Sequence, residues 1–365
     1  MYQIIKNNLI KHVPNFQKKF EEIYVTVSSR RYMKSIIKKK KLPKLSPSEI
    51  KAAKSYYKSK GYNLKNTYWH RYYKAMNGEF HKEYVPYDIF NPKINPRLNK
   101  RKQWPALLDK NLSYNLFEGF AQPKRVVQNI NGFYYIEEKI VNLDEAIKAC
   151  NRINKRLIIK PTIDSGKGRL VNAFTVENYK TSYENLNVKE LFQLYKKDFI
   201  VQEFLEQSEV IASLNPSSLN TLRVVTYLNL DGVHVLSSVL RIGELGSSTD
   251  NFSKGGLFCG ILKDGQLKGK GYSPNGTILT KTSTGIVLKE CKIPNYEKLQ
   301  DMTKLMHFRV PYFKIISWDI AINKNNEPVL IEYNTHRQGI DLQIASGPLF
   351  GKFADEILDI GLQPY

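Results

Sequence analysis

The stretch from Ile315 to Asn334, IISWDIAINKNNEPVLIEYN, constrains this chain most, because it places oxygen-bearing side chains on two adjacent strands. Its two apolar, β-branched runs are separated by the polar residues 324–327, which is the pattern of a β-hairpin. Asp319 and Glu332 can then face each other, and strand alternation puts Asn334 on the same face as Glu332. Hard oxygen ligands at this spacing suit Mg²⁺. A half-buried strand pair with two exposed acids explains the same pattern.

Length and composition limit the classes of protein to which this chain can belong. At 365 residues and 42% hydrophobic content, the chain can bury a sizeable core in two or three lobes. Its cysteines, Cys150, Cys259 and Cys291, are too far apart for a zinc motif or a disulfide framework. No apolar run reaches the roughly 20 residues that span a bilayer, and the N-terminus lacks the apolar core of a secretory signal. These features predict a cytoplasmic protein.

The net charge of +22 is concentrated in the first third of the chain. Residues 1–110 hold 26 Lys and Arg against 7 Asp and Glu, a net +19, which leaves only +3 for the remainder. Solvated helix faces, peripheral contact with an anionic membrane and a nucleotide-linked substrate are alternative explanations. Most of the motifs described below lie in the nearly neutral remainder, which argues against nucleic acid as the partner.

Helical patterns dominate the basic segment 1–105, where residues 46–49 (SPSE) form a helix start. Residues 68–73 (YWHRYY) are its densest aromatic group, and they either pack one helix onto another or stack on a sugar or base. The prolines between residues 86 and 105 predict an extended crossing to the next lobe.

Residues 106–205 are predicted to form a small α/β lobe, with a helix from Asp109. A strand ending at Lys160 precedes the glycine-bearing turn 161–168 (PTIDSGKG), where backbone N–H groups and the lysine could bind a phosphate chain. The turn has neither Walker A spacing nor a Rossmann fingerprint, and a plain hairpin explains it as easily. The strand 199–205 (FIVQEFL) ends in polar residues, as does either an adenine-binding segment or an ordinary strand.

Residues 206–365 are predicted to be mainly β-strands around a helix at 296–307. Arg223 and Arg241 lie inside apolar strands. Because an unpaired buried arginine is costly, each must meet a carboxylate or another anion. A structural salt bridge and a substrate phosphate are equally acceptable partners.

In their order and spacing, these motifs resemble the ATP-grasp superfamily and its sugar-transfer-associated branch, which is found with bacterial capsule and lipopolysaccharide synthesis genes. The resemblance rests on WH (69–70), NG (77–78), DK (109–110), IKP (159–161), SGKG (165–168), VQE (201–203), LNTLR (219–223), RIG (241–243), DN (250–251), GG (255–256), WD (318–319), LIEYN (330–334) and GPLFG (347–351). It implies an α/β fold in which two lobes, 106–205 and 206–365, clamp ATP behind the helical segment 1–105.

The resemblance also implies roles for the matching positions. Lys110 and Lys160 would hold the ATP phosphates beneath a loop that contains Ser165, Gly166 and Lys167. The adenine would lie against Gln202, Glu203 and Leu205, with its ribose on Glu209. Two Mg²⁺ ions would bind Asp319, Glu332 and Asn334, while Arg223 and Arg241 would lie near the transferring phosphoryl and acyl groups.

The reaction that the resemblance implies is amide formation by a ligase that activates a carboxylate as an acyl phosphate. An anionic sugar carboxylate, a uronic acid of a nucleotide sugar or surface polysaccharide, suits both the gene setting and the basic first segment. The second substrate would be a small amine, an amino acid or amino alcohol, for which no general base is identifiable. A kinase of a sugar hydroxyl and a basic polyanion-binding protein are the alternatives.

Overall fold

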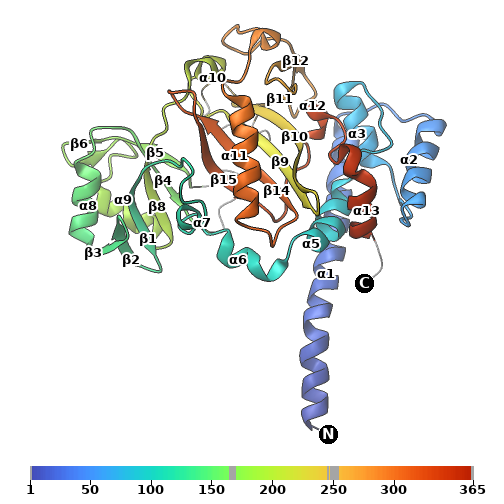
Figure 1. Ribbon diagram of the computed structural model, residues 1–365, viewed down its shortest axis with the longest axis horizontal. Coiled ribbons are helices and arrows are strands. Elements are labelled where there is room, and N and C mark those ends of the chain that lie inside the picture. Colours follow the sequence, from blue (N-terminus) through green and yellow to red (C-terminus); the bar gives the residue numbers. More distant parts are fainter. Residues whose placement is uncertain (1, 164–169, 245, 247–254, 363–365) are drawn as a thin grey trace.

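The computed structural model describes residues 2–163, 170–244, 246 and 255–362, with side chains from residue 19 onward. Two antiparallel sheets lie side by side in it, each covered by helices, and a long N-terminal helix projects from the body (Figure 1). The predicted mixed α/β fold with a helical N-terminal segment is confirmed.

The smaller sheet belongs to the second segment of the chain and contains six strands. Its spatial order is β3 (Lys139–Val141), β2 (Phe133–Ile136), β1 (Arg125–Ile130), β8 (Phe199–Glu203), β4 (Leu157–Pro161) and β5 (Asn172–Phe174). Helices α8 (Leu143–Asn151) and α9 (Val188–Tyr195) pack against it, and β6 (Val176–Glu177) pairs with β7 (Lys180–Thr181). Both helices begin with a capping box, Asn142 with Glu145 and Asn187 with Glu190, which satisfies their first backbone N–H groups.

The larger sheet contains seven strands and includes the predicted hairpin of residues 315–334. Its order is β13 (Ile278–Leu279), β12 (Leu267–Tyr272), β11 (Leu257–Ile261), β10 (Gly232–Ile242), β9 (Thr221–Asn229), β14 (Ile315–Ile322) and β15 (Pro328–Asn334). The helical elements of this part of the chain are α10 (Glu209–Leu214), η4 (Leu288–Glu290), α11 (Tyr296–Phe308), α12 (Gln343–Ser346), η5 (Gly351–Phe353) and α13 (Ala354–Leu362).

The two faces of the larger sheet are covered differently. Val224 and Trp318 point into a core that includes α11, where the Trp318 indole donates a 2.7 Å hydrogen bond to Thr226. Val225 points to the opposite face, where α12 and α13 pack. Because strand side chains alternate, Arg223, two residues from Val225, also lies on this second face. The candidate site is therefore on the side of the sheet that faces α12.

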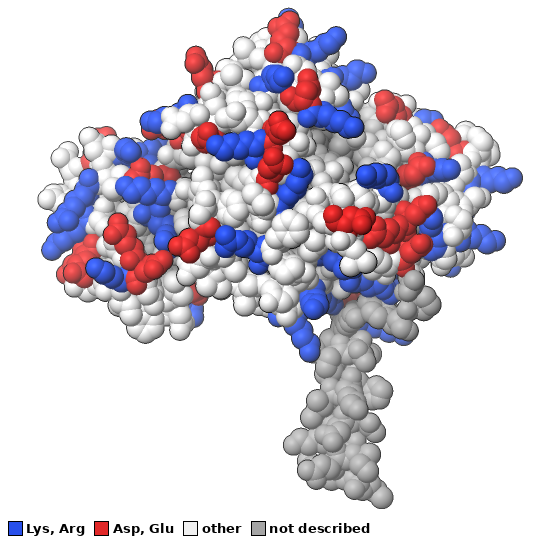
Figure 2. All heavy atoms as spheres, viewed as in Figure 1, with Lys and Arg blue, Asp and Glu red and all other residues white. Residues whose placement is uncertain are grey.

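The N-terminal segment packs against that same face. It contains α1 (Tyr2–Lys39), α2 (Pro47–Ser59), α3 (Tyr68–Asn77), α4 (Tyr87–Ile89), η1 (Phe90–Ile94), α5 (Asn95–Leu98), η2 (Arg101–Gln103), α6 (Trp104–Leu107) and α7 (Ser113–Leu116). The predicted helix start is present, since Ser46 and Glu49 form a capping box. Residues 69, 70, 72 and 73 are all buried, so packing is the main role of the aromatic group in α3. On the face seen in Figure 2, acidic and basic side chains interleave over the body.

Two local predictions are wrong. The proline-bearing stretch from 86 to 105 is a chain of short helical turns rather than an extended crossing. Pro96 and Pro105 are the second residues of α5 and α6, in the first turn, where the backbone N–H has no intrahelical partner to lose. No helix begins at Asp109, because its carboxylate accepts a 2.8 Å hydrogen bond from the backbone N–H of Asn111 and closes a turn instead.

No helix in the described part of the chain combines the length and the apolar character needed to cross a membrane.

Gly260 of β11 sets how closely α12 approaches the sheet. A Cβ atom at this position would lie 2.5 Å from the carbonyl oxygen of Ala345 and 2.7 Å from Cδ of Lys268. We expect Gly260→Ala to lower the free energy of unfolding by about 1–3 kcal/mol, because the backbone of α12 must shift. Thermal and denaturant unfolding measure this. Gly339→Ala is the control, since its Cβ would meet nothing within 4 Å; equal stability of the two variants would contradict the close packing.

Candidate active site

The hairpin of β14 and β15 forms with the predicted register, and Asp319 stands directly opposite Glu332. A register shift follows Asp319, so the ladder is irregular at the position where the two acids meet. Asp319 is 3% exposed, whereas Glu332 keeps about a third of its side chain in contact with solvent. Asp319 is therefore enclosed by other residues of the protein, whereas solvent can reach Glu332.

Arg223 and Arg241 both bind Asp319. The Arg223 guanidinium donates to the Asp319 carboxylate through Nε and through Nη2, the latter at 2.9 Å. Arg241 Nη1 donates to the same carboxylate at 3.1 Å. Burial would raise the pKa of Asp319, but the two guanidinium groups outweigh it and hold that pKa below its ordinary value. Asp319 thus stays ionised, and it satisfies the requirement that each buried arginine meet an anion.

Two lysines of the other lobe approach Glu332. Lys110 Nζ lies 3.7 Å from the Glu332 carboxylate, and the backbone N–H of Lys110 donates to Thr162 just beyond β4. Lys160, near the end of β4, is buried. Burial and, to a smaller extent, the charge of Lys110 lower the pKa of Lys160 to about 8, with Glu332 opposing them. Lys110, Lys160, Glu332, Asp319 and the two arginines therefore form one array that joins the two sheets.

Asn334 ends β15 on the face of Glu332. Its Nδ2 atom is buried without a hydrogen-bond partner. A buried unsatisfied amide is costly, and a half-turn of the amide would present its oxygen at that position instead. Within the described residues, no three His, Cys, Asp or Glu side chains gather as a metal site. The available donor set is therefore two carboxylates and an amide oxygen, which is the oxygen-only chemistry that Mg²⁺ prefers.

The predicted adenine-binding residues lie where the two sheets connect. Gln202 is buried and donates to the Tyr114 hydroxyl, while the Glu203 carboxylate is engaged by Lys124 at 3.0 Å and Lys155 at 3.1 Å. Both side chains already have partners within the protein. An adenine bound at this segment would therefore be recognised by backbone groups.

Leu205 is half-buried in the connection that follows β8, and Glu209 is exposed at the first turn of α10. Backbone hydrogen bonds tie this connection to the hairpin of β14 and β15, from Ser208 to Ile322 and from Lys324 to Glu206, both at 2.9 Å. Ser165, Gly166 and Lys167 lie outside the described residues.

Sequence reasoning missed the polar residues that hold this array from behind. Asn111 receives a 2.9 Å hydrogen bond from Gln128 and donates to Asn129 and Thr162, which fixes the segment next to Lys110 against the smaller sheet. Tyr114, the partner of Gln202, was also missed. No local sequence signal distinguishes these residues from ordinary loop residues.

Comparison with known proteins finds no curated protein that matches this chain. Similar solved structures include the ATP-grasp ligase PsnB complexed with minimal precursor, Mg and ADP, at 12% identity over 73% of this chain and 62% of that chain, with a TM-score of 0.41. They also include D-alanine–D-alanine ligase from Bacillus anthracis, at 14% identity over 70% of this chain and 66% of that chain, with a TM-score of 0.39. The chain thus spans less than two thirds of the length of PsnB.

A family model described as sugar-transfer associated ATP-grasp matches residues 89–357. The match covers most of the 365 residues and includes both sheets and every residue assigned to the candidate site. The chain belongs to the sugar-transfer associated ATP-grasp family.

Proposed function

We propose that this protein is an ATP-dependent carboxylate–amine ligase that forms an amide through an acyl phosphate, with the uronic acid of a nucleotide sugar or surface polysaccharide as its carboxylate. The observation that carries the proposal is the array in which Lys110 and Lys160 from one lobe meet Glu332, Asp319 and two arginines from the other. Four cationic side chains against two carboxylates suit a polyanionic substrate. The family description supports a sugar as the setting of the reaction.

The residues present fit Mg²⁺. Glu332 offers an accessible carboxylate, and Asn334 offers an amide whose buried Nδ2 atom has no hydrogen-bond partner. Asp319 offers a carboxylate that has more lone pairs than its arginines use. Bound there, Mg²⁺ would neutralise charge on the phosphate oxygens.

Arg223 and Arg241 would bind the phosphoryl and acyl oxygens of the reacting groups. Each guanidinium has five N–H donors in a planar fork, and the Nη1 group of Arg223 is not part of its pair with Asp319. A phosphoryl or acyl oxygen placed over the sheet would meet donors whose orientation Asp319 already fixes. Such preorganised donors stabilise charge that develops during phosphoryl transfer and during attack by the amine.

Substitution of Lys160 tests whether this lysine binds the phosphates of ATP. Lys160→Met keeps the buried stem but removes the charge, so the fold should persist while ATP affinity falls about tenfold or more, as expected for loss of a charged phosphate contact. Calorimetry with ATP and Mg²⁺ measures the change. Lys180→Met, an exposed position in β7, is the matched control. Unchanged affinity of the Lys160 variant would remove this lysine from the phosphate site.

Substitution of Glu332 tests whether this carboxylate binds Mg²⁺. Glu332→Gln retains the shape of the side chain but not its charge, so we expect a folded protein whose Mg²⁺-dependent turnover is about a hundredfold lower. Turnover measured over a range of Mg²⁺ concentrations shows whether more metal restores activity. Glu297→Gln, an exposed acid of α11, should behave like the unchanged protein. If the Glu332 variant keeps the original metal dependence, the metal assignment is wrong.

The labelling pattern of the released phosphate separates a ligase from a kinase. In an acyl-phosphate route, one carboxylate oxygen attacks the γ-phosphorus, and the amine later displaces phosphate that retains this oxygen. With ¹⁸O-labelled carboxylate, label should therefore appear in inorganic phosphate only when amide forms. Mass spectrometry of phosphate and amide, over a panel of uronic acids and small amines, makes the measurement. Unlabelled phosphate beside genuine amide would refute the acyl phosphate, and a phosphorylated sugar hydroxyl would identify a kinase.

A further inference from the structure

Helix α1 carries apolar side chains on two opposite faces, and the fold buries only one of them. On the inner face, Met33 and Ile37 are buried in a cluster that includes Tyr73 of α3. One turn earlier, Arg30 pairs with the buried carboxylate of Asp88 in α4. These contacts explain why one side of the helix is apolar, but they do not explain the other side.

The outer face begins with a stripe of exposed apolar side chains. Its members are spaced i, i+3, i+4 and i+7, and between 39% and 63% of the surface of each is exposed to solvent: Phe20, Ile23, Tyr24 and Val27. This spacing places all four on one side of a helix. Scattered exposed apolar residues are ordinary, whereas a contiguous apolar patch is typical of a surface that binds a partner. In the sequence, the same spacing of three and four residues continues upstream at Phe16, Val13 and Leu9.

Basic side chains follow the apolar stripe on the same face. Arg31, Lys34 and Lys38 are exposed, and they continue from Val27 at the spacing of successive helical turns. In Figure 1, α1 runs from the projecting N-terminus into the body, so the apolar stripe lies nearer the projecting end than the basic residues do. The outer face is therefore apolar in one half and cationic in the other.

The acidic residues of α1 pair with the body instead. Glu21 pairs with Arg101 at 3.1 Å and with Arg337 at 3.4 Å. Glu22 pairs with Lys93. The sequence of the helix contains no other Asp or Glu, whereas it contains nine Lys and Arg. The positive charge of the outer face is therefore not balanced by acids of the same helix.

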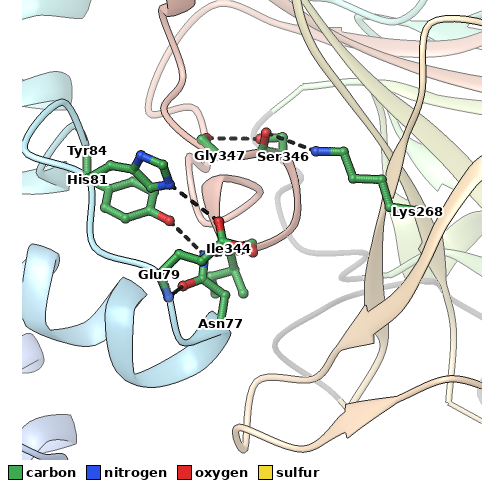
Figure 3. A network of polar contacts seen from close by, with 8 residues as sticks. All are labelled: Asn77, Glu79, His81, Tyr84, Lys268, Ile344, Ser346 and Gly347. Carbon is green, nitrogen blue, oxygen red and sulfur yellow. Dashed lines mark hydrogen bonds and ion pairs between the residues drawn. The ribbon is translucent and has the colours of Figure 1, made fainter.

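The inner face attaches α1 to the lobe that carries the candidate site. Asn77, at the end of α3, donates both to the Tyr84 hydroxyl at 2.7 Å and to the carbonyl of Ile344 at 3.1 Å (Figure 3). Ile344 of α12 belongs to the same buried cluster as Met33 and Ile37 of α1. A partner bound to the outer face of α1 is therefore held at a fixed position relative to the larger sheet.

We propose that the outer face of α1, formed by the apolar stripe and the basic residues that follow it, binds the surface of a membrane that contains anionic phospholipids. The apolar side chains enter the boundary between headgroups and acyl chains, and the basic side chains bind headgroup phosphates. The attachment is peripheral, because the helix lies along the interface and does not cross it. This inference is independent of the proposed ligase reaction, since binding to a membrane requires neither substrate.

Charge favours a lipid surface over a second copy of this chain. The nine basic residues of α1 stand against two acids that the body already engages, so pairing of two copies along this helix brings like charges together. Anionic headgroups balance the basic half of the face, and acyl chains accept the apolar half. A nucleic acid would satisfy the basic half alone. An anionic membrane surface is thus the one of these partners that matches both halves.

Co-sedimentation with vesicles tests the apolar half of this face, with the full chain and without substrates. The unchanged protein should bind vesicles of phosphatidylcholine mixed with phosphatidylglycerol and should stay in solution with phosphatidylcholine alone. The triple variant Phe20→Gln, Ile23→Gln, Val27→Gln should bind the mixed vesicles about tenfold or more weakly, because the apolar contribution is lost. The matched control, which should bind like the unchanged protein, removes three exposed apolar side chains elsewhere: Leu230→Gln, Leu305→Gln and Phe308→Gln.

The basic half of the face is tested separately. The triple variant Arg31→Gln, Lys34→Gln, Lys38→Gln should bind the mixed vesicles about a hundredfold more weakly, since each cation near an anionic surface contributes about a fivefold factor. The matched control removes three exposed charges of the smaller lobe: Lys139→Gln, Lys148→Gln and Lys189→Gln. If the charge variant loses binding while the apolar variant retains it fully, the face is a general polyanion site and the membrane assignment is wrong.

Fluorescence shows whether the stripe enters the lipid. On addition of anionic vesicles with brominated acyl chains, Tyr24→Trp should emit farther to the blue and be quenched. Tyr179→Trp, at another exposed tyrosine between β6 and β7, is the control and should not change. An unchanged spectrum of Tyr24→Trp, or equal vesicle binding by the triple variants and their controls, would overturn the proposal.

Two further measurements separate this inference from its alternatives. If sedimentation without lipid shows that the unchanged protein is a dimer and that the apolar variant is a monomer, and vesicles bind neither, the face is an interface between copies and the proposal is wrong. Calorimetry with ATP and Mg²⁺ should give one affinity for all these variants, because none of the replaced residues belongs to the candidate site. Loss of vesicle binding and failure of the ligase reaction are therefore distinguishable results.

Discussion

The structure depends on the burial of Asp319 between Arg223 and Arg241 in the middle of the larger sheet. Three charges withdrawn from water are costly unless each is paired, and here one carboxylate serves two guanidinium groups from neighbouring strands. The pairing fixes the orientation of both arginines before any substrate arrives. It also leaves an excess of positive charge on this face, to which Lys110 and Lys160 add from the other lobe. The four cationic side chains therefore outnumber the two carboxylates, and this net positive charge favours an anionic ligand.

Much of this arrangement could be predicted from sequence, because the hairpin is a local structure. A polar turn between two β-branched runs determines the register, and the register brings Asp319 opposite Glu332. The partner of the arginines could not be predicted in the same way. Both a carboxylate and a phosphate satisfied the rule for a buried arginine, and only the strand order β10-β9-β14 shows that Asp319 is within reach.

Other features escaped prediction because their cause is tertiary. Strand β12 carries Gly269 and Gly271, which disfavour a strand on their own but allow close contact with Lys289 and Leu288. The sequence left the role of Trp69 open between packing and stacking on a sugar or base, and the structure shows a buried ring that packs on Tyr87. The unsatisfied N–H of that ring follows from its neighbours in space and has no signature in the sequence.

One hydrophobic core joins the two ends of the described chain, and this affects how the protein folds. Tyr57, Ile89 and Ile94 of the N-terminal segment are buried together with Ile340, Phe350 and Ile357. Contacts between residues so distant in sequence carry a large loop-closure entropy and slow folding. During synthesis, the apolar side of the N-terminal helices must remain uncovered until residues 340–358 have been made, while the smaller sheet has all its strands by residue 203. The smaller lobe can thus fold on the ribosome first, and the larger one closes around both ends of the chain only after its last strands have been translated.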